Sequence, residues 1–378
     1  MHLTLHLTTA CNLRCGYCYA PPRAGPRMSE ETAAKALDLG ARLSEGSCGV
    51  IFFGGEPLLE RDLIRATVDR ARALERRTKA RFHFKITTNG VLLDQEFLAL
   101  AEREGILVAL SVDGIREAHD RHRRFADGRP SFDIVQARLR MLLAARPYSS
   151  VILVVNPDTV PFLSESVSYL LDEGCRYLIV SLNYAGDWSE RSLRALERQY
   201  RKLGRSYVRW TRAGRKFYLS PFEVKLASHI DGCRYRRDRC ELAKRQISVD
   251  PEGFLFPCVQ FPAAGSQSEW CIGHVERGLD EKARARVRRA VDAEQEECRS
   301  CALRDRCNHT CGCLNWQTTG SVDRVSGVLC RHERMLMPIA DRVGKILYRR
   351  RDPLFLHKQY NAAYPVLSLL EDAAARRS

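Results

Sequence analysis

Short apolar runs alternate with longer amphipathic stretches through the first half of the chain, and this pattern limits the possible fold more than any other feature. Strands are predicted at 3–8, 50–53, 82–87, 107–112, 151–155 and 177–182. Helices are predicted at 29–44, 61–75, 94–104, 132–145 and 161–173, with Ser29 and Asp94 as N-caps. Strand–helix units in series predict an α/β fold with a parallel sheet and right-handed crossovers. Periodicity alone leaves a doubly wound sheet and an open, partial (β/α) barrel equally favoured.

Chemically distinctive residues follow the first four predicted strands. Cys11–Cys18 come after the first strand, Gly54–Pro57 after the second, Thr88–Gly90 after the third and Asp113–Gly114 after the fourth. In both candidate folds the carboxyl ends of parallel strands lie at one edge, where ligands bind. The sequence therefore predicts one shared active site built from these segments.

The composition is that of a globular chain, with 45% hydrophobic and 28% charged residues among 378. No run of eighteen apolar residues is present, so no membrane span is expected. Met1–Thr8 alternates apolar and polar residues and lacks the basic start and apolar core of a signal peptide. These features predict a cytoplasmic location, where clustered cysteines bind metal more often than they form disulfides.

The fifteen cysteines fall into two groups that flank a cysteine-poor scaffold. Three lie within Cys11–Cys18 and ten between Cys233 and Cys330. Only Cys48 and Cys175 lie between the groups, in apolar surroundings, and they are predicted to be small buried hydrophobes. The distribution predicts two separate metal-bearing regions.

The first group has the spacing Cys11-x3-Cys15-x2-Cys18, which places three thiolates on one tight loop. Three thiolates can bind three irons of a four-iron cluster and leave the fourth iron open to a small molecule. A ferredoxin-type or zinc loop is the alternative, but zinc normally takes four ligands and no fourth local cysteine is present. Tyr17 beside the last cysteine and the position after the first strand favour the open cluster.

This loop resembles the signature of the radical S-adenosylmethionine (SAM) superfamily, and the resemblance spans roughly residues 1–185. Further motifs that match the family are Gly54, Gly55 and Glu56 of a GGEP sequence, Asn89 of a TNG segment, Ser111 and Asp113 of an S-x-D-G segment, and Arg123. The resemblance implies that these residues and Tyr17 bind SAM. Glu56 would accept from the SAM ammonium, Ser111 would contact the ribose and Arg123 the carboxylate.

The C-terminal cysteines resemble the SPASM domain, an auxiliary-cluster extension of peptide-modifying radical SAM enzymes. The resemblance covers roughly residues 230–335, including a strand pair at 247–249 and 254–256. It implies two auxiliary [4Fe-4S] clusters. The first would be bound by Cys233, Cys240, Cys258 and Cys311, and the second by Cys298, Cys301, Cys307 and Cys330. Cys271 and Cys313 are rivals for the place of Cys233, which lies outside the core pattern.

Four segments follow from these features. A partial (β/α)6 TIM-like barrel is expected at 1–190, a linking helical segment at 191–229, a small cysteine-rich SPASM extension at 230–335, and a C-terminal helix and tail at 336–378. Within the second segment, 192–215 reads as a solvated basic helix. A further amphipathic helix is expected at 335–350.

The family resemblance implies reductive cleavage of SAM to a 5′-deoxyadenosyl radical, which removes hydrogen from a substrate. A ribosomally made precursor peptide is the expected substrate, modified by a crosslink or an oxidation. Sulfatase maturation is one alternative, although Val259 stands where that family has an aspartate base after the second SPASM cysteine. Modification of a non-peptide cofactor or tetrapyrrole is another.

The resemblance also implies partners. A flavodoxin- or ferredoxin-type protein would donate electrons, and a separate leader-binding protein is expected because no such domain precedes Met1. The net charge of +15 suits an acidic peptide or a generally arginine-rich surface. Nucleic acid and membrane are not expected as partners, because no nucleic-acid motif and no aromatic–basic interleaving is present.

Overall fold

The first seven strands of the chain lie in sequence order across one curved sheet, and two later strands extend it beside the first. We analysed a computed structural model, which describes residues 1–19, 25–232, 242–292 and 295–375. The strands in chain order are β1 His2–Thr8, β2 Ser47–Gly54, β3 Arg81–Thr88, β4 Leu107–Ser111, β5 Ser150–Val155, β6 Tyr177–Leu182, β7 Tyr218–Leu219, β8 Gln246–Val249 and β9 Leu255–Phe256. They form one sheet in the order β7-β6-β5-β4-β3-β2-β1-β8-β9. A separate two-stranded sheet joins β10 Gly273–His274 to β11 Gly278–Leu279.

The strand order decides between the two folds that periodicity left open. Strands β1 to β6 are all parallel to their neighbours, and consecutive strands are adjacent. A doubly wound sheet would reverse its strand order near the middle. The fold is therefore an open, partial (β/α) barrel, as one of the two alternatives predicted.

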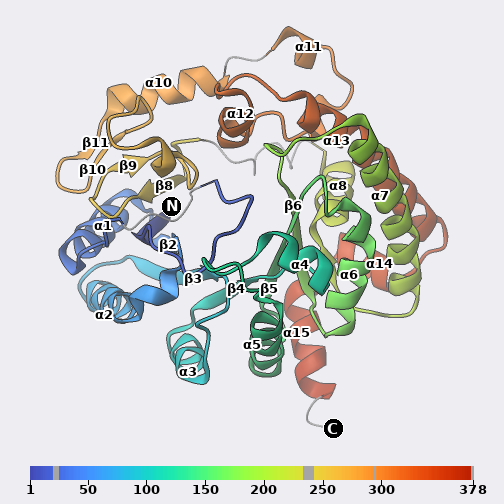
Figure 1. Ribbon diagram of the computed structural model, residues 1–378, viewed down its shortest axis with the longest axis horizontal. Coiled ribbons are helices and arrows are strands. Elements are labelled where there is room, and N and C mark those ends of the chain that lie inside the picture. Colours follow the sequence, from blue (N-terminus) through green and yellow to red (C-terminus); the bar gives the residue numbers. More distant parts are fainter. Residues whose placement is uncertain (20–24, 233–241, 293–294, 376–378) are drawn as a thin grey trace.

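Helices cover the outside of the curved sheet, as Figure 1 shows for α1, α2, α3, α5 and α6. The first six helices are α1 Glu30–Leu43, α2 Arg61–Arg77, α3 Gln95–Glu104, α4 Arg116–His122, α5 Phe132–Ala145 and α6 Leu163–Asp172. Ser29 and Asp94 accept hydrogen bonds from the backbone N–H groups of Thr32 and Phe97, so both predicted N-caps are confirmed. Helix α4 lies in a stretch that the sequence left as a loop.

The later helices follow the barrel. They are α7 Glu190–Arg212, α8 Ser220–Asp231, α10 Glu281–Asp292, α11 Glu296–Arg299, α12 Gly312–Thr319, α13 Gly327–Arg349, α14 Pro353–Tyr360 and α15 Tyr364–Ala375. Single 3-10 turns occur at Pro57–Glu60, Val160–Phe162, Phe261–Ala264 and Arg304–Arg306. No helix in the described part of the chain is long and apolar enough to cross a lipid bilayer.

The core lies between the sheet and its helices. Leu3, Leu5 and Leu7 of β1 are fully buried, and Phe52 stacks on Phe84 with ring centroids 5.9 Å apart. Cys48 and Cys175 are buried among these apolar side chains, which confirms their predicted role as small hydrophobes.

Helix α7 differs from the solvated linking helix that its basic composition predicted. One face buries Leu196, Tyr200, Leu203 and Tyr207, and the helix packs against α13. The prediction was wrong because the arginines gather on one stripe only, while large apolar side chains recur at helical spacing on the other.

The sheet also includes a strand from the cysteine-rich region. β8 pairs in parallel with β1, with His2 opposite Gln246 and Leu5 opposite Val249, and β9 pairs with β8 in antiparallel fashion. The hairpin predicted at 247–256 is thus present, but its addition to the sheet beside β1 was not predicted. The pairing brings the segment that carries Cys258 to the edge where Cys11–Cys18 lie.

Candidate functional site

The Cys11–Cys18 loop is held by backbone hydrogen bonds to a distant segment. The N–H groups of Arg14 and Gly16 donate to the carbonyls of Arg124 and His122, at 2.7 and 3.1 Å. Leu13 and Phe125 form an antiparallel bridge. Within the loop, Cys18 N–H donates to the Cys15 carbonyl at 3.0 Å. The protein backbone therefore fixes the curl of the cysteine loop.

The two glycines of Gly54-Gly55 allow the end of β2 to lie against the base of this loop. Gly55 N–H donates to the Thr8 carbonyl and Glu56 N–H to the Ala10 carbonyl, both at 2.8 Å. A Cβ added at Gly55 would lie 2.0 Å from the Ala10 carbonyl oxygen, and Gly54 has a φ of +126°. Only glycine fits this close approach and this backbone conformation.

The Glu56 carboxylate is fully buried and accepts three hydrogen bonds from the protein. The Thr88 hydroxyl and the Leu58 N–H donate to Oε1 at 2.7 and 3.0 Å, and the Asn89 N–H donates to Oε2 at 2.8 Å. Burial raises the pKa of this carboxyl group, while the three hydrogen bonds lower it. The side chain joins the loop after β2 to the loop after β3.

Asn89 extends this connection to the cysteine loop. Its Nδ2 donates to Asn12 Oδ1 at 2.7 Å and lies 3.6 Å from Cys11 Sγ. The Leu13 N–H also points to Cys11 Sγ, at 3.4 Å. Asn12 Nδ2 is buried and has no acceptor among the described residues. Donors therefore surround the first predicted ligand.

Asp113 and Arg123 form a buried ion pair beside Tyr17. Arg123 Nε lies 3.1 Å from Asp113 Oδ2, and the two side chains are 7% and 2% exposed. The Tyr17 hydroxyl donates to the same oxygen at 2.6 Å, and Val154 N–H donates to Oδ1 at 3.0 Å. The pair links the cysteine loop, the end of β4 and the end of α4.

Cys15 lies close to this ion pair. Burial raises the pKa of the Cys15 thiol to about 11; the Arg123 guanidinium opposes the rise, and Asp113, Cys11 and Cys18 add to it. Because Cys11 and Cys18 both raise the pKa of Cys15, the three thiols lie in one neighbourhood. Ser111, the last residue of β4, is largely buried at the same edge.

Sequence reasoning missed the residues that support this arrangement. Buried His119 accepts from the Asp113 N–H through Nδ1 at 3.3 Å and contacts the Ser131 hydroxyl through Nε2 at 3.0 Å. Asp120 accepts from the N–H groups of Ser131 and Phe132, at the start of α5. Their only signal in the sequence is proximity to Asp113, because no fixed spacing marks such supporting residues.

A second group of thiols lies near the barrel edge. Cys311 Sγ and Cys313 Sγ are 3.6 Å apart, and the Cys313 thiol also hydrogen-bonds Cys258. The hydrogen bond from Cys313 lowers the pKa of Cys311. Cys271 instead points to the Gly273 carbonyl, 3.4 Å away. Cys233 and Cys240 lie outside the described residues.

Cys301, Cys307 and Cys330 share a third neighbourhood. Arg334 Nε donates to Cys330 Sγ at 3.4 Å. This hydrogen bond raises the pKa of the Arg334 guanidinium, and the charges of Cys330, Cys301 and Cys307 raise it further. Burial raises the pKa of Cys307 to about 12. Cys298 begins the same segment, in the short helix α11. In the described ranges, no three His, Cys, Asp or Glu side chains lie close enough together to hold a single metal ion.

Tyr19 connects the first cysteine loop to the second group. Its hydroxyl donates to the Val259 carbonyl at 3.3 Å. Burial raises the pKa of the Tyr19 hydroxyl, and the nearby thiols of Cys18, Cys258 and Cys313 raise it further. A cavity of about 310 Å³ lies beside this contact, lined by residues that include Tyr19, Gly54, Gly55, Asp250 and Val259. The structure therefore places a hollow between the two predicted metal-bearing regions.

Comparison with known proteins agrees with this geometry. A family model described as the Radical SAM superfamily matches residues 5–162. A cysteine-type anaerobic sulfatase-maturating enzyme of Clostridium novyi is 26% identical over 44% of this chain and 47% of its own length. A PqqA peptide cyclase of Granulibacter bethesdensis is 27% identical over 85% of each chain.

Coverage of other relatives is partial. An uncharacterised protein of Methanocaldococcus jannaschii is 31% identical, but the match spans 48% of this chain and 62% of that protein. The chain thus covers less than two thirds of this relative and about half of the sulfatase-maturating enzyme.

The fold extends the likeness to nearly the whole chain. Native anSMEcpe, solved with bound AdoMet, superimposes with a TM-score of 0.77 at 17% identity, over 91% of this chain and 98% of that one. The family match falls on the barrel strands that carry the cysteine loop, Gly54-Gly55-Glu56, Asn89 and the Asp113–Arg123 pair. Residues 5–162, which carry these side chains, are therefore similar to the Radical SAM superfamily.

Proposed function

We propose that this chain is a radical SAM enzyme that modifies a ribosomally made peptide. One observation carries the proposal: the ends of β1 to β4 are tied into a single site by buried hydrogen bonds. Glu56 joins the loops after β2 and β3, Asn89 reaches the cysteine loop, and Asp113 joins that loop to Arg123. Such fixed positioning is what a protein contributes to cofactor chemistry.

Cys11, Cys15 and Cys18 are the proposed ligands of a [4Fe-4S] cluster with one open iron. The surroundings fit this group. Asn89 Nδ2 lies 3.6 Å from Cys11 Sγ and can donate to cluster or cysteine sulfur, and the neighbouring Asn12 Nδ2 is a buried donor without a partner within the described ranges. Iron binding would also remove the proton that burial otherwise keeps on the Cys15 thiol.

The loop at Gly54-Gly55 is proposed to hold SAM next to the cluster. The Glu56 carboxylate is engaged by three protein donors, so we assign it a positioning role. Contact with the SAM ammonium would then fall to the backbone of Gly54 and Gly55, which line the 310 Å³ cavity. Ser111 is proposed to meet the ribose. Arg123, held by Asp113, would meet the carboxylate through its remaining N–H groups.

When bound, the reduced cluster and SAM supply a 5′-deoxyadenosyl radical that removes hydrogen from the substrate. The chain's own residues bind SAM, orient it and exclude water around it. The cavity between Tyr19, Asp250 and Val259 is the proposed entry point for the peptide residue that reacts. Burial raises the pKa of Asp250 to about 6, so this carboxyl group can exchange a proton near neutral pH.

Two auxiliary [4Fe-4S] clusters are proposed for the cysteine-rich region. The contact of Cys258, Cys311 and Cys313 supports the first, and favours Cys313 over Cys271 as the rival of Cys233. The neighbourhood of Cys301, Cys307 and Cys330 supports the second, with Cys298 as the fourth ligand. Cys240 completes the first set by family resemblance.

Peptide chemistry is favoured by what is known of similar proteins. The fold of anSMEcpe has also been solved with a bound Cp18Cys peptide, at a TM-score of 0.75 to this chain and 17% identity. Sulfatase maturation is the second candidate, since a relative bears that name. Val259 offers no carboxylate at the predicted base position, and its carbonyl is occupied by Tyr19. We therefore favour a crosslink or oxidation in another peptide.

Anaerobic reconstitution with iron and sulfide, followed by incubation with SAM and dithionite, tests the proposal. We expect 5′-deoxyadenosine to form, measured by liquid chromatography. Cys15→Ala should abolish the product and retain the iron of the auxiliary clusters. Absence of 5′-deoxyadenosine from the fully reconstituted wild-type protein would refute the proposed function.

A further inference from the structure

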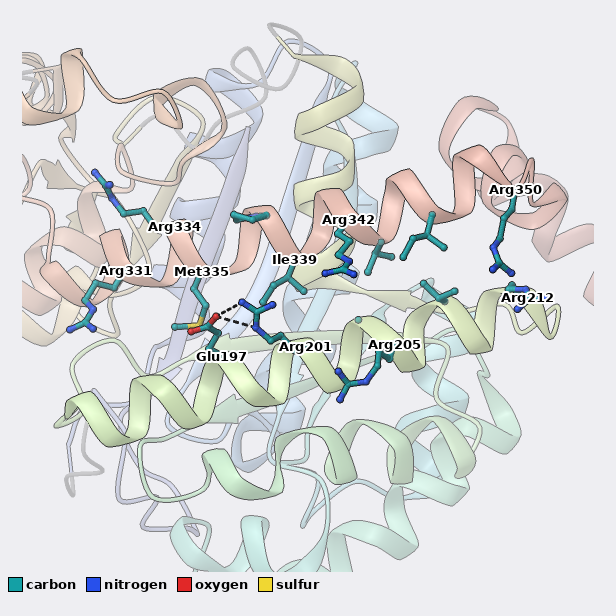
Figure 2. A pocket seen from close by; sticks show the side chains of 15 residues that line it. Glu197, Arg201, Arg205, Arg212, Arg331, Arg334, Met335, Ile339, Arg342 and Arg350 are labelled. Carbon is teal, nitrogen blue, oxygen red and sulfur yellow. Dashed lines mark hydrogen bonds and ion pairs between the residues drawn. The ribbon is translucent and has the colours of Figure 1, made fainter.

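A groove lies between α7 and α13, and none of the residues assigned to the SAM site lines it. Its volume is about 870 Å³, and seven arginines and one glutamate are among the residues that line it. Figure 2 shows these arginines along both edges of the groove, with Met335 and Ile339 between them. The arginines are Arg201, Arg205, Arg212, Arg331, Arg334, Arg342 and Arg350.

The floor of the groove is apolar and is set by close helix packing. Val208, Met335, Ile339, Val343 and Ile346 contribute to its lining. Gly204 lets the helices approach, because a Cβ there would lie 3.2 Å from Val343 Cγ2. The lining runs from Glu197 to Arg212 on α7 and covers about 22 Å, the length of about 15 helical residues.

Four of the arginines are exposed and have no carboxylate partner in the described part of the chain. Arg201 pairs with Glu197 at 2.6 Å, Arg331 with Glu190 at 2.7 Å, and Arg334 contacts Cys330. The four remaining are Arg205, Arg212, Arg342 and Arg350. Like charges held along an apolar floor repel one another, and a bound anionic partner would relieve the repulsion.

The groove also has a direction relative to the active site. Helix α7 follows β6, so its N-terminus starts at the edge where the carboxyl ends of the strands lie. Helix α13 runs alongside, since Arg331 near its start pairs with Glu190 at the start of α7. One end of the groove therefore lies toward the catalytic edge, next to Cys330.

We propose that this groove binds an acidic, amphipathic helical segment of the polypeptide that the enzyme modifies. Apolar side chains of that segment would cover Met335 and Ile339, and its carboxylates would pair with Arg205, Arg342 and their neighbours. Its position would deliver the adjoining stretch of substrate to the catalytic edge. The identity of the occupant as substrate rests on the proposed function, whereas the binding of an acidic helix does not.

The lining favours a peptide over nucleic acid. No aromatic side chain occurs among the described residues that line the groove, so bases would find no stacking platform. The apolar floor suits leucine-type side chains of a helix better than a phosphate backbone.

Fluorescence anisotropy with the full-length reconstituted protein tests the groove. The probe is a fluorescein-labelled synthetic helix of about 15 residues, with leucines on one face and glutamates on the other. Three comparison probes are the same peptide with lysine for glutamate, single-stranded DNA, and vesicles of anionic phospholipid. We expect saturable binding of the acidic helix alone, weakened by added salt.

Matched variants locate the binding. Arg205→Glu/Arg342→Glu reverses two charges in the groove, and Arg198→Glu/Lys345→Glu reverses two on the same helices outside it. The groove variant should bind the acidic helix at least about tenfold more weakly, while the control variant binds as the wild type does. Equal binding by both variants, no saturable binding by the wild type, or stronger arginine-dependent binding of DNA or vesicles would overturn the proposal.

A second readout separates this proposal from the proposed function. 5′-Deoxyadenosine formation without peptide is measured on the same preparations, and both double variants should retain it. Helix binding without SAM cleavage would sink the proposed function and spare the groove as an acidic-helix site. SAM cleavage without helix binding would refute the acidic-helix site and leave the proposed function in place.

Discussion

The two cysteine regions are built in different ways. At Cys11–Cys18, the backbone is paired with 122–125 and lies against Gly55 through hydrogen bonds that need no metal. In the region from Cys298 to Cys311, α11 has four residues, a 3-10 turn has three, and neither buries a residue. The first site is a loop supported by a sheet, whereas the second has little structure of its own to support it.

This difference indicates what metal would do in each region. In the barrel the protein sets the geometry and a cluster would occupy it. Between Cys298 and Cys311 a cluster would take the place of a core, since small metal domains derive their folding energy from metal binding.

Iron removal should separate the two regions most strongly. After anaerobic chelation, backbone amides between Cys298 and Cys311 should exchange hydrogen more than about a hundredfold faster, because their order depends on metal. Amides of β3 and β4 should keep their protection. Hydrogen exchange read by mass spectrometry measures both, and equal loss of protection in the two regions would break the contrast.

Breaking the buried ion pair should destabilise the barrel site without any involvement of metal. Arg123→Ala leaves the Asp113 carboxylate buried without its cation, which should lower the free energy of unfolding by about 3 kcal/mol. Denaturant unfolding of the metal-free protein measures the loss. An Asp113→Asn/Arg123→Met double variant should recover part of it, and no recovery would argue against the pair as the cause.

Replacing the buried glutamate should have a smaller effect. In Glu56→Gln the new amide faces the Asn89 N–H and leaves that donor without an acceptor, at a cost of about 2 kcal/mol. The exposed Glu31→Gln serves as the control and should leave unfolding unchanged. A Glu56→Gln protein as stable as the wild type would show that the loops after β2 and β3 do not depend on this carboxylate.

Asp250 should make stability depend on pH at the cavity. Its pKa is raised by burial to about 6, so between about pH 4 and 6 the folded state keeps a proton that the unfolded state has lost. As the pH rises from about 4 to 6, the free energy of unfolding of the wild type should therefore fall by up to about 2 kcal/mol relative to that of Asp250→Asn. Unfolding curves of both proteins at several pH values check this, and parallel pH profiles would contradict it.

Much of the barrel was predictable because its signals are local. Alternating apolar runs gave the strands, and Ser29 and Asp94 marked helix starts with their own side chains. The addition of β8 beside β1 was not predictable, since pairing across more than two hundred residues leaves no periodic trace. The burial of α7 was misjudged because its arginines conceal the apolar stripe beneath them.

At the site, sequence motifs located the residues but not their contacts. Glu56 and Asp113 were expected to face a ligand, and in the structure both bond to the protein on several sides. The neighbourhood of Cys258, Cys311 and Cys313 arises from chain folding between distant segments, which spacing alone does not describe. A motif therefore predicts where a site lies better than it predicts each side chain's task.

We propose that the sheet-supported loop of Cys11, Cys15 and Cys18 holds a cluster with an open iron that binds SAM. Electron paramagnetic resonance of the dithionite-reduced Cys258→Ala/Cys311→Ala protein, recorded with and without SAM, tests it most directly. We expect one component of the reduced-cluster signal to change shape when SAM is added. Further substitution of Cys15→Ala should remove that component and leave only the signal of the second auxiliary cluster, which does not respond to SAM. A signal that is unchanged by SAM, or that survives Cys15→Ala with the same SAM response, would contradict the account.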